Sequence, residues 1–253
     1  MSSYVRARDL FASLIVAAFA MAASPVFAAA CPVSHETLLA ALKASVKPTG
    51  GPSNGGLDTN EWASVVDRTG AVCAIAFSGA KADDQWPGSR AISAEKAFTA
   101  NGLSLREAAI STANLWAAAQ PGGSLYSLVA SNPVNPAAIY AGPATADGTA
   151  KDPMIGKVAG GIIVFGGGLA LYDGKDVVGG LGVSGDTSCA DHNIAWRIRQ
   201  KLGLDKVPAG VGQNRNDGII YDVGPTGKSA SGWGHPTCGG TEQSVATQIG
   251  AGK

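Results

Sequence analysis

The segment EWASVVDRTGAVCAIAFS, residues 61–78, contains two strand-like runs separated by a tight turn. The runs 61–68 and 71–78 are rich in apolar residues, and Thr69-Gly70 between them are turn residues. Two short runs of this kind joined by a tight turn predict a β-hairpin, whose strands pair antiparallel. The fold is therefore expected to contain an antiparallel sheet.

A second hairpin and several helices are predicted from the rest of the chain. The strand-like runs 160–173 and 176–184 flank the turn residues Gly174-Lys175. Apolar residues recur at helical spacing in 36–46, 91–100, 105–119 and 187–202, and short strands are predicted at 122–129 and 218–222. Because hairpins connect the strands and the helices are segregated from them, the pattern favours an α+β fold over an α/β fold.

Capping residues predict where some of these helices begin and end. Ser34 and Ser104 are placed to cap the helices that follow them. Ser188 with Asp191 three residues later resembles a capping box at the start of the last helix, and Gly203 supplies its C-terminal stop.

The composition is that of a compact globular protein. The chain has 253 residues, of which 45% are hydrophobic and 15% charged, and this excludes a disordered, highly charged chain. Its 19 basic residues balance 19 acidic ones, so bulk charge gives it no reason to bind nucleic acid or an anionic membrane. A small-molecule ligand is the expected partner.

The first 28 residues have the pattern of a signal peptide. Arg6 and Arg8 precede an apolar run, 10–23, which is too short to span a bilayer comfortably, and small residues follow it. Cleavage after Ala28 would leave a periplasmic or secreted protein without a membrane segment. The mature chain is expected to comprise one domain, 29–204, and a Gly-rich C-terminal extension, 205–253. Cys31 directly after three alanines leaves open a lipoprotein alternative.

The four cysteines of an exported chain are expected to form two disulfides. Three pairings are open. The pairing Cys31–Cys73 with Cys189–Cys238 joins near neighbours in the folding order, and it is the one we favour.

Three segments together resemble the GlcG/HbpS-like (DUF336) haem-binding-domain family. They are VVDRTGAVCAIAF (65–77), EKAFTANGL (95–103) and DVVGGLGVSGDTSCADHNIA (176–195), and the resemblance covers roughly residues 35–204. The resemblance implies a profilin-like α+β fold, frequent homo-oligomers, and the binding or degradation of haem or corrinoids. The chain departs from the short family pattern by a Pro/Gly-rich insertion at 132–157 and by the extension after residue 204.

The glycines Gly180, Gly182 and Gly185 match the G-x-G-x-x-G pattern of dinucleotide-binding loops. The preceding strand belongs to a predicted hairpin, however, whereas a dinucleotide-binding unit needs a parallel crossover. The favoured interpretation is a Gly-rich strand that lets a flat ligand or another backbone approach closely.

Two short motifs mirror each other near the third and fourth cysteines. Cys-Ala-Asp-His ends at His192 and His-Pro-Thr-Cys begins at His235. A Cys189–Cys238 bridge would bring both imidazoles within about one helical turn of the disulfide, so that they could face one pocket. Trp196 shares the helix face of His192, and Trp233 lies two residues before His235.

These residues predict a ligand site with His192 as a ligand of haem iron. The two imidazoles and two indoles would form the wall for a flat apolar ring system, with His235 in a secondary role. Two alternatives remain: a simple disulfide staple with polar surface histidines, or a zinc set of two thiolates and two imidazoles. A second location for the site is the helix that carries Lys96 and Phe98, where basic side chains opposite the last helix could meet a propionate.

The sequence thus predicts an exported protein that binds a small planar ligand, with haem as the first candidate cofactor. The alternatives are a haem-degrading enzyme and a non-catalytic, oligomeric accessory protein. No local motif decides whether any reaction is catalysed.

Overall fold

The computed structural model describes residues 30–47, 54–212 and 214–252. The predicted signal peptide lies outside these residues. The sheet has four strands in the order β2-β1-β4-β3, and all its pairings are antiparallel. The strands are β1 (Trp62–Asp67), β2 (Val72–Phe77), β3 (Gly168–Asp173) and β4 (Asp176–Ser184). Both predicted hairpins are confirmed, and the structure is an α+β fold.

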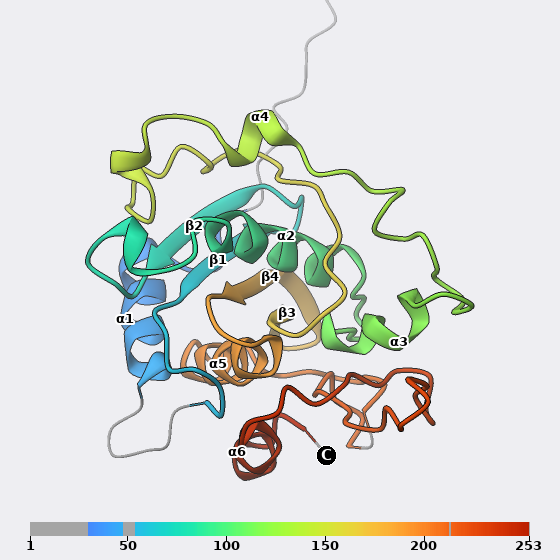
Figure 1. Ribbon diagram of the computed structural model, residues 1–253. Coiled ribbons are helices and arrows are strands. Elements are labelled where there is room, and N and C mark those ends of the chain that lie inside the picture. Colours follow the sequence, from blue (N-terminus) through green and yellow to red (C-terminus); the bar gives the residue numbers. More distant parts are fainter. Residues whose placement is uncertain (1–29, 48–53, 213, 253) are drawn as a thin grey trace, which may run out of the picture.

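Helices cover both faces of this sheet (Figure 1). Helix α2 (Ser89–Gly102) packs on one face, mainly against β4 and β1. Helices α1 (His35–Val46) and α5 (Ser188–Lys201) pack on the other face and against each other. Alternation along β1 separates the two cores, because Trp62 and Val66 pack with α2 whereas Ala63 and Val65 pack with α1 and α5.

The helix starts follow from side-chain caps, with one correction. Ser34 caps α1 as predicted, since its hydroxyl accepts a hydrogen bond from the Thr37 N–H. The cap of α5 is Thr187 and not Ser188, because the Thr187 hydroxyl accepts from the Ala190 N–H. Asp191 instead accepts a hydrogen bond from the Asp186 N–H just before the helix.

The glycines of strand β4 allow helix α2 to pack very close to the sheet. A Cβ added at Gly180 would lie 2.2 Å from the Ala97 carbonyl oxygen, and one at Gly182 would lie 2.0 Å from that of Ser93. Any side chain at either position would collide with the helix backbone. The interpretation of the glycine pattern as a close-packing device is confirmed, with a backbone as the neighbour.

Three element predictions between the hairpins were wrong. Residues 160–167 lie outside the sheet, and 122–129 form turns instead of a strand. The expected helix 105–119 is limited to a short 3-10 turn, η2 (Ala113–Leu115), and α3 (Trp116–Ala119). The helical turns begin late because Ser111 and Asn114 cap them reciprocally: the Asn114 side-chain oxygen accepts from the Ser111 N–H, and the Ser111 hydroxyl accepts from the Asn114 N–H.

The Pro/Gly-rich insertion 132–157 packs over α2 and β2 rather than leaving the domain. It contains α4 (Pro136–Ile139) and η3 (Ala144–Ala146), and the short turn η1 (Ala82–Asp84) lies in the β2–α2 connection. Ile139 and Met154 join the core of α2. The buried Arg90 guanidinium holds the insertion by two hydrogen bonds to the Asp152 carboxylate.

The C-terminal extension packs against α5 and carries an unpredicted helix, α6 (Glu242–Ile249). The expected strand 218–222 is reduced to an isolated bridge between Ile219 and Gly252. Both favoured disulfides are present, and the Cys31 sulfur is bonded to Cys73, which leaves it no thiol for a lipid. Among the described helices, none is both long and apolar enough to cross a membrane.

Candidate functional site

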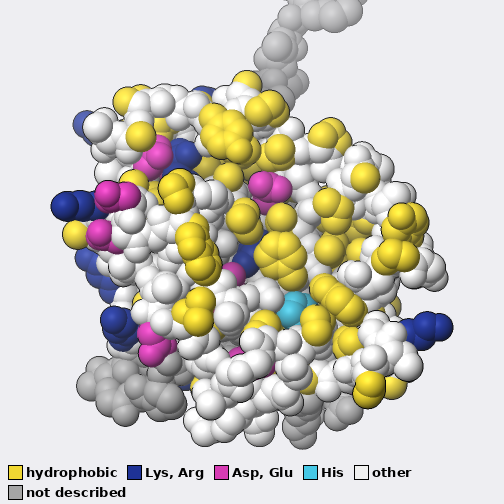
Figure 2. All heavy atoms as spheres, in the orientation of Figure 1, with side chains coloured by type: hydrophobic (Ala, Val, Ile, Leu, Met, Phe, Trp, Pro, Cys, Tyr) yellow, Lys and Arg dark blue, Asp and Glu magenta, His cyan; other side chains and the backbone are white. Residues whose placement is uncertain are grey.

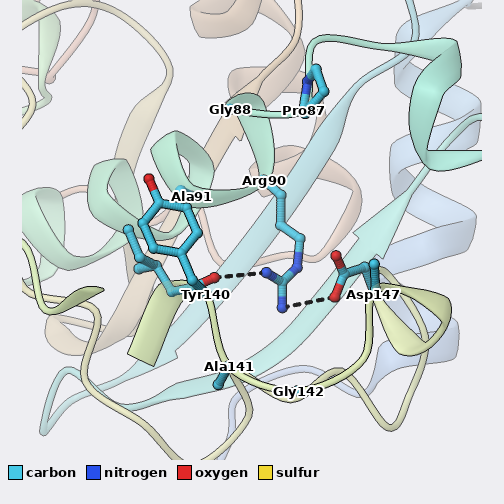
Figure 3. A pocket seen from close by; sticks show the side chains of 10 residues that line it. Pro87, Gly88, Arg90, Ala91, Tyr140, Ala141, Gly142 and Asp147 are labelled. Carbon is cyan, nitrogen blue, oxygen red and sulfur yellow. Dashed lines mark hydrogen bonds and ion pairs between the residues drawn. The ribbon is translucent and has the colours of Figure 1, made fainter. Parts of the chain in front are cut away.

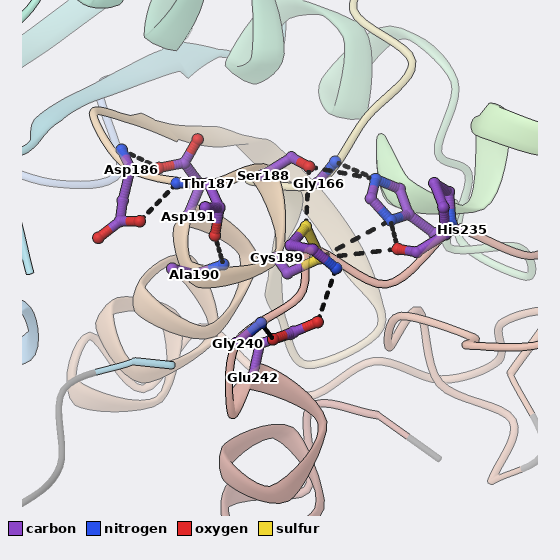
Figure 4. The surroundings of a disulfide bond; sticks show 12 residues. Gly166, Asp186, Thr187, Ser188, Cys189, Ala190, Asp191, His235, Gly240 and Glu242 are labelled. Carbon is purple, nitrogen blue, oxygen red and sulfur yellow. Dashed lines mark hydrogen bonds between the residues drawn. A yellow bond between two sulfur atoms is a disulfide. The ribbon is translucent and has the colours of Figure 1, made fainter. Parts of the chain in front are cut away.

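The first of the mirrored motifs lies at the start of α5 and the second lies in the C-terminal extension, and a disulfide joins the two segments (Figure 4). The Cys189–Cys238 disulfide joins the first turn of α5 to the extension, with the two Cα atoms 6.1 Å apart. His235 lies beside it, with Nδ1 3.9 Å from the Cys189 sulfur. The spacing argument therefore located His235 correctly at the bridge.

The hydrogen bonds of His235 define its tautomer. Its Nδ1 lies 2.7 Å from the Pro236 carbonyl oxygen and can only donate to it. Nε2 is then an acceptor, and its neighbours are the Gly166 N–H and the Ser188 hydroxyl, both 3.4 Å away. Burial lowers the pKa of His235 to about 4, so the ring is neutral at physiological pH.

His192 is completely buried, with an exposed fraction of 0%. Among the described residues, neither of its ring nitrogens has a hydrogen-bond partner. Burial lowers the pKa of this imidazole to about 3. The histidine is thus a neutral, unpartnered imidazole inside the protein rather than a group on an open pocket or a polar surface.

The predicted indoles take different positions. The Trp196 ring stacks near His192, with centroids 6.2 Å apart, and the Arg199 guanidinium lies 4.6 Å from the Trp196 ring. Trp233 is half-buried in the extension. A further indole, Trp116 of α3, lies 6.4 Å from the His235 ring. Sequence reasoning missed Trp116, because only the folded path of the extension brings it to this place.

Lys96 belongs to α2, on the face of the sheet opposite the last helix, but its side chain reaches the start of α5 and forms an ion pair there. Its ammonium group is fully buried, 2.6 Å from the Asp191 carboxylate and 2.8 Å from the Val183 carbonyl oxygen. Phe98, two residues along α2, is half-buried, and its ring lies close to Gly70 in the β1–β2 turn. The two residues therefore point to different surroundings and do not form one wall.

The Lys96–Asp191 ion pair has a third buried ionisable neighbour, the Glu61 carboxyl group, which sequence reasoning missed. Glu61 is fully buried, and its carboxyl oxygens have no hydrogen-bond partner among the described residues. Burial, together with the negative charge of Asp191, raises the pKa of Glu61 well above its usual range. Burial also raises the pKa of Asp191 to about 6, against the opposing effect of Lys96. An acid at the start of a strand gives no sequence signal for such burial.

Residues 160–167, which we call the covering segment, lie against the side chains of His192 and Lys96. The Ile163 N–H donates to the Thr99 hydroxyl of α2. A Cβ added at Gly166 would lie 2.2 Å from the Ser188 carbonyl oxygen and 3.1 Å from the His192 Cβ. One added at Gly167 would lie 2.7 Å from the Lys96 nitrogen. The glycines thus let the backbone of the covering segment approach Ser188, the His192 Cβ and the Lys96 ammonium group closely.

The face in Figure 2 shows a histidine side chain near its centre, among hydrophobic side chains. Basic and acidic side chains are visible beside it, between the same hydrophobic groups. Phe165 of the covering segment lies 5.1 Å from the Lys96 nitrogen. The covering segment therefore places an aromatic ring next to the buried ammonium group.

The insertion forms two further cavities away from this site. One, of about 410 Å³, lies at the start of α2 beside Arg90, Tyr140 and Asp147 (Figure 3). The other, of about 490 Å³, is lined by Trp62 and residues of the same insertion. The residues that line them include none of those predicted to bind the ligand. The Arg90 guanidinium is occupied by Asp152, Asp147 and the Ile139 carbonyl oxygen.

Comparison with known proteins gives one family. The model of the family described as haem degrading protein HbpS-like matches residues 58–199. A crystal structure of Klebsiella pneumoniae protein ORFY is 25% identical and has a TM-score of 0.44, covering 66% of this chain and 86% of that one. A PduOC:heme complex is 22% identical with a TM-score of 0.47, covering 68% and 94%. No curated protein matches the chain.

Proposed function

The chain belongs to the HbpS-like family, and on this premise we propose that it binds haem. The observation that carries the proposal is the state of His192, which lies inside the region that the family model matches. A neutral imidazole that is buried and has no hydrogen-bond partner in the described structure is costly unless a ligand uses it. His192 would hold haem through its iron, because a neutral imidazole nitrogen is a common ligand of haem iron.

The surroundings of His192 fit a flat, apolar macrocycle. Trp196 stacks beside the imidazole, and Phe165 lies in the covering segment above the neighbouring Lys96. We propose His192 as the iron ligand, and His235, Trp196 and Trp233 as the wall around the ring. The neutral state of both imidazoles favours coordination, because a protonated imidazole cannot donate its lone pair to a metal.

Haem can reach His192 only if the covering segment moves. Gly166 and Gly167 give this segment backbone freedom at the point where it touches Ser188 and Lys96. Its displacement would uncover the Lys96–Asp191 ion pair together with the imidazole. We propose that Lys96 then also meets a haem propionate, because its ammonium group has three N–H donors and Asp191 and the Val183 carbonyl oxygen accept only two of them. Phe98, on another side of α2, would contact the ligand only if the site were at that alternative location.

Haem degradation is the second candidate, because the family description names that activity. When bound, haem supplies the iron that reduces oxygen in such chemistry; the chain's part would be to hold the ring and exclude water. The third candidate is a non-catalytic accessory role in a homo-oligomer. We also propose export to the periplasm or the medium, with which the two disulfides are compatible.

A haem titration of the mature protein separates these candidates. A Soret band that saturates at one haem per chain supports binding. Loss of that band with release of iron, after addition of a reductant in air, supports degradation. The absence of a saturable Soret change would exclude both haem binding and haem degradation and leave the accessory role. The readout for that role is the subunit number, measured by light scattering.

A further inference from the structure

Cys189, Cys238 and His235 place three potential metal ligands together. One donor atom from each lies within 4.8 Å of the other two. In the structure the two sulfurs are bonded to each other, so they offer no thiolate. We propose that reduction of this disulfide converts the cluster into a site for a thiolate-seeking divalent ion such as zinc, with two thiolates and one imidazole as ligands.

The His235 nitrogen that faces the disulfide is Nδ1, 3.9 Å from the Cys189 sulfur. In the oxidised protein this nitrogen carries the ring proton and donates it to the Pro236 carbonyl oxygen at 2.7 Å. A metal ion would bind through Nδ1, and the ring proton would move to Nε2. The Ser188 hydroxyl lies 3.4 Å from Nε2 and can then accept the Nε2–H, as hydrogen bonds from the other ring nitrogen commonly orient metal-binding histidines.

The ligands stay in place without the disulfide because other bonds hold the extension. The His235 N–H donates to the Ile220 carbonyl oxygen at 2.7 Å, and the Cys238 N–H donates to the Glu242 carboxylate at 2.7 Å. The Asn193 side chain of α5 in turn donates to the Glu242 carbonyl oxygen. Cys238 and His235 are therefore held by contacts that reduction does not break, and Cys189 is held by its place in α5.

A thiol reductant supplies the electrons and protons that open the Cys189–Cys238 disulfide. Two thiol molecules transfer two electrons and two protons to the Cys189–Cys238 bond and leave as their own disulfide. The metal ion then displaces the two protons from the protein thiols as it binds. Cys238 and Ser188 are only half-buried, so solvent can supply the fourth ligand at this edge. Metal binding and the disulfide exclude each other, which makes the site redox-controlled.

The other disulfide provides a matched control in the same chain. Cys31 and Cys73 also bond two segments, with Cα atoms 5.6 Å apart. In the part of the chain that the structure describes, however, they belong to no group of three potential ligands. Reduction of that bridge should therefore create no comparable site.

Cobalt(II) is the probe, because its thiolate complexes absorb strongly. The mature, haem-free protein is reduced with a phosphine and titrated with Co²⁺. We expect one Co²⁺ per chain with thiolate-to-cobalt absorption in reduced wild type and in the C31S/C73S variant. We expect no such absorption in the oxidised protein or in the reduced C189S/C238S variant. His235→Ala should weaken binding by about tenfold or more.

The proposal shares His235 with the proposed haem site, but it is tested on haem-free protein, so its failure can be told apart from a failure to bind haem. It is overturned if the reduced C31S/C73S variant shows no thiolate-to-cobalt absorption, or if His235→Ala binds Co²⁺ as tightly as its parent. Near-UV circular dichroism follows the fold throughout. A reduced protein that loses its signal and regains it with Co²⁺ also supports the site, because metal binding then drives refolding. A signal that Co²⁺ does not restore counts against it.

Discussion

Arg199 of α5 and Asp217 of the C-terminal extension form a two-pronged ion pair that is fully buried. Both guanidinium Nη atoms lie 2.7 Å from a carboxylate oxygen, and the two side chains are 1% and 0% exposed. Nη1 also donates to the Ala170 carbonyl oxygen of β3. The pair joins the region that matches the family to the extension that does not, so the extension is packed as part of the folded unit.

Removing one partner of this pair should destabilise the protein strongly. Asp217→Ala leaves the Arg199 guanidinium charged and buried, which costs about 3–5 kcal/mol of unfolding free energy. Urea denaturation measures the change. The matched control is Asp176→Ala at the exposed Arg106–Asp176 pair, whose side chains are 59% and 65% exposed. Asp176→Ala should change the unfolding free energy by no more than about 1 kcal/mol. Equal effects of the two substitutions would contradict the structural role of the buried pair.

The sequence predicted the sheet well because hairpins are local. The turns Thr69-Gly70 and Gly174-Lys175 fix the pairing of the runs on either side of them, and all four strands lie within the predicted runs. The central pairing of β1 with β4 is not local, because about ninety residues of chain separate the two hairpins, and no turn between them could predict it. The predicted helix 105–119 was wrong in its start, because Ser111 and Asn114 cap the helical turns only at that point.

The site was only partly predictable, because burial depends on distant segments. The cysteine spacing located His235 beside the disulfide. The covering segment, expected to be a strand, instead closes over His192, so nothing in the local sequence showed that this helix residue would be buried. Glu61 and Trp116 also gave no signal, since the residues that surround them come from elsewhere in the chain.

Gly182→Ala should destabilise the protein through a clash with α2. The added Cβ would lie 2.0 Å from the Ser93 carbonyl oxygen and 2.5 Å from the Ala97 nitrogen, both backbone atoms. Overpacking of this kind costs about 1–3 kcal/mol or more, and thermal unfolding should show it. Gly102→Ala is the control, because no heavy atom lies within 4 Å of its added Cβ. Should both variants melt together, the close approach of α2 would not depend on glycine.

Glu61→Gln should stabilise the protein at neutral pH. The pKa of Glu61 is raised in the folded state, so folding at pH 7 either binds a proton or buries a charge, whereas the unfolded chain ionises freely. The stability contributed by the protonated carboxyl is present below the unfolded pKa of 4.5 and is lost as pH rises toward the folded pKa. Gln has no such ionisation to oppose folding.

The readout for Glu61→Gln is the unfolding free energy as a function of pH. Its advantage over wild type should grow as pH increases from 4.5 toward neutrality. Asp83→Asn, on an exposed residue of η1, serves as the control and should follow the wild-type curve. An advantage for Glu61→Gln that is constant across this pH range would show that ionisation is not its cause.

His192→Ala should abolish or shift the Soret band of the haem complex while the fold persists. The imidazole has no hydrogen bonds to lose among the described residues, so its removal leaves no polar partner unsatisfied. His192→Leu is a second variant that keeps the space filled if the alanine variant folds poorly.

His35→Ala is the control, because His35 lies on α1 and bonds the Ile75 carbonyl oxygen of β2, away from the covering segment. His235→Ala should weaken haem binding less, as a wall residue. Unchanged Soret spectra and affinities in both the His192 and His235 variants would move the site elsewhere, with Lys96 and Phe98 the next residues to substitute.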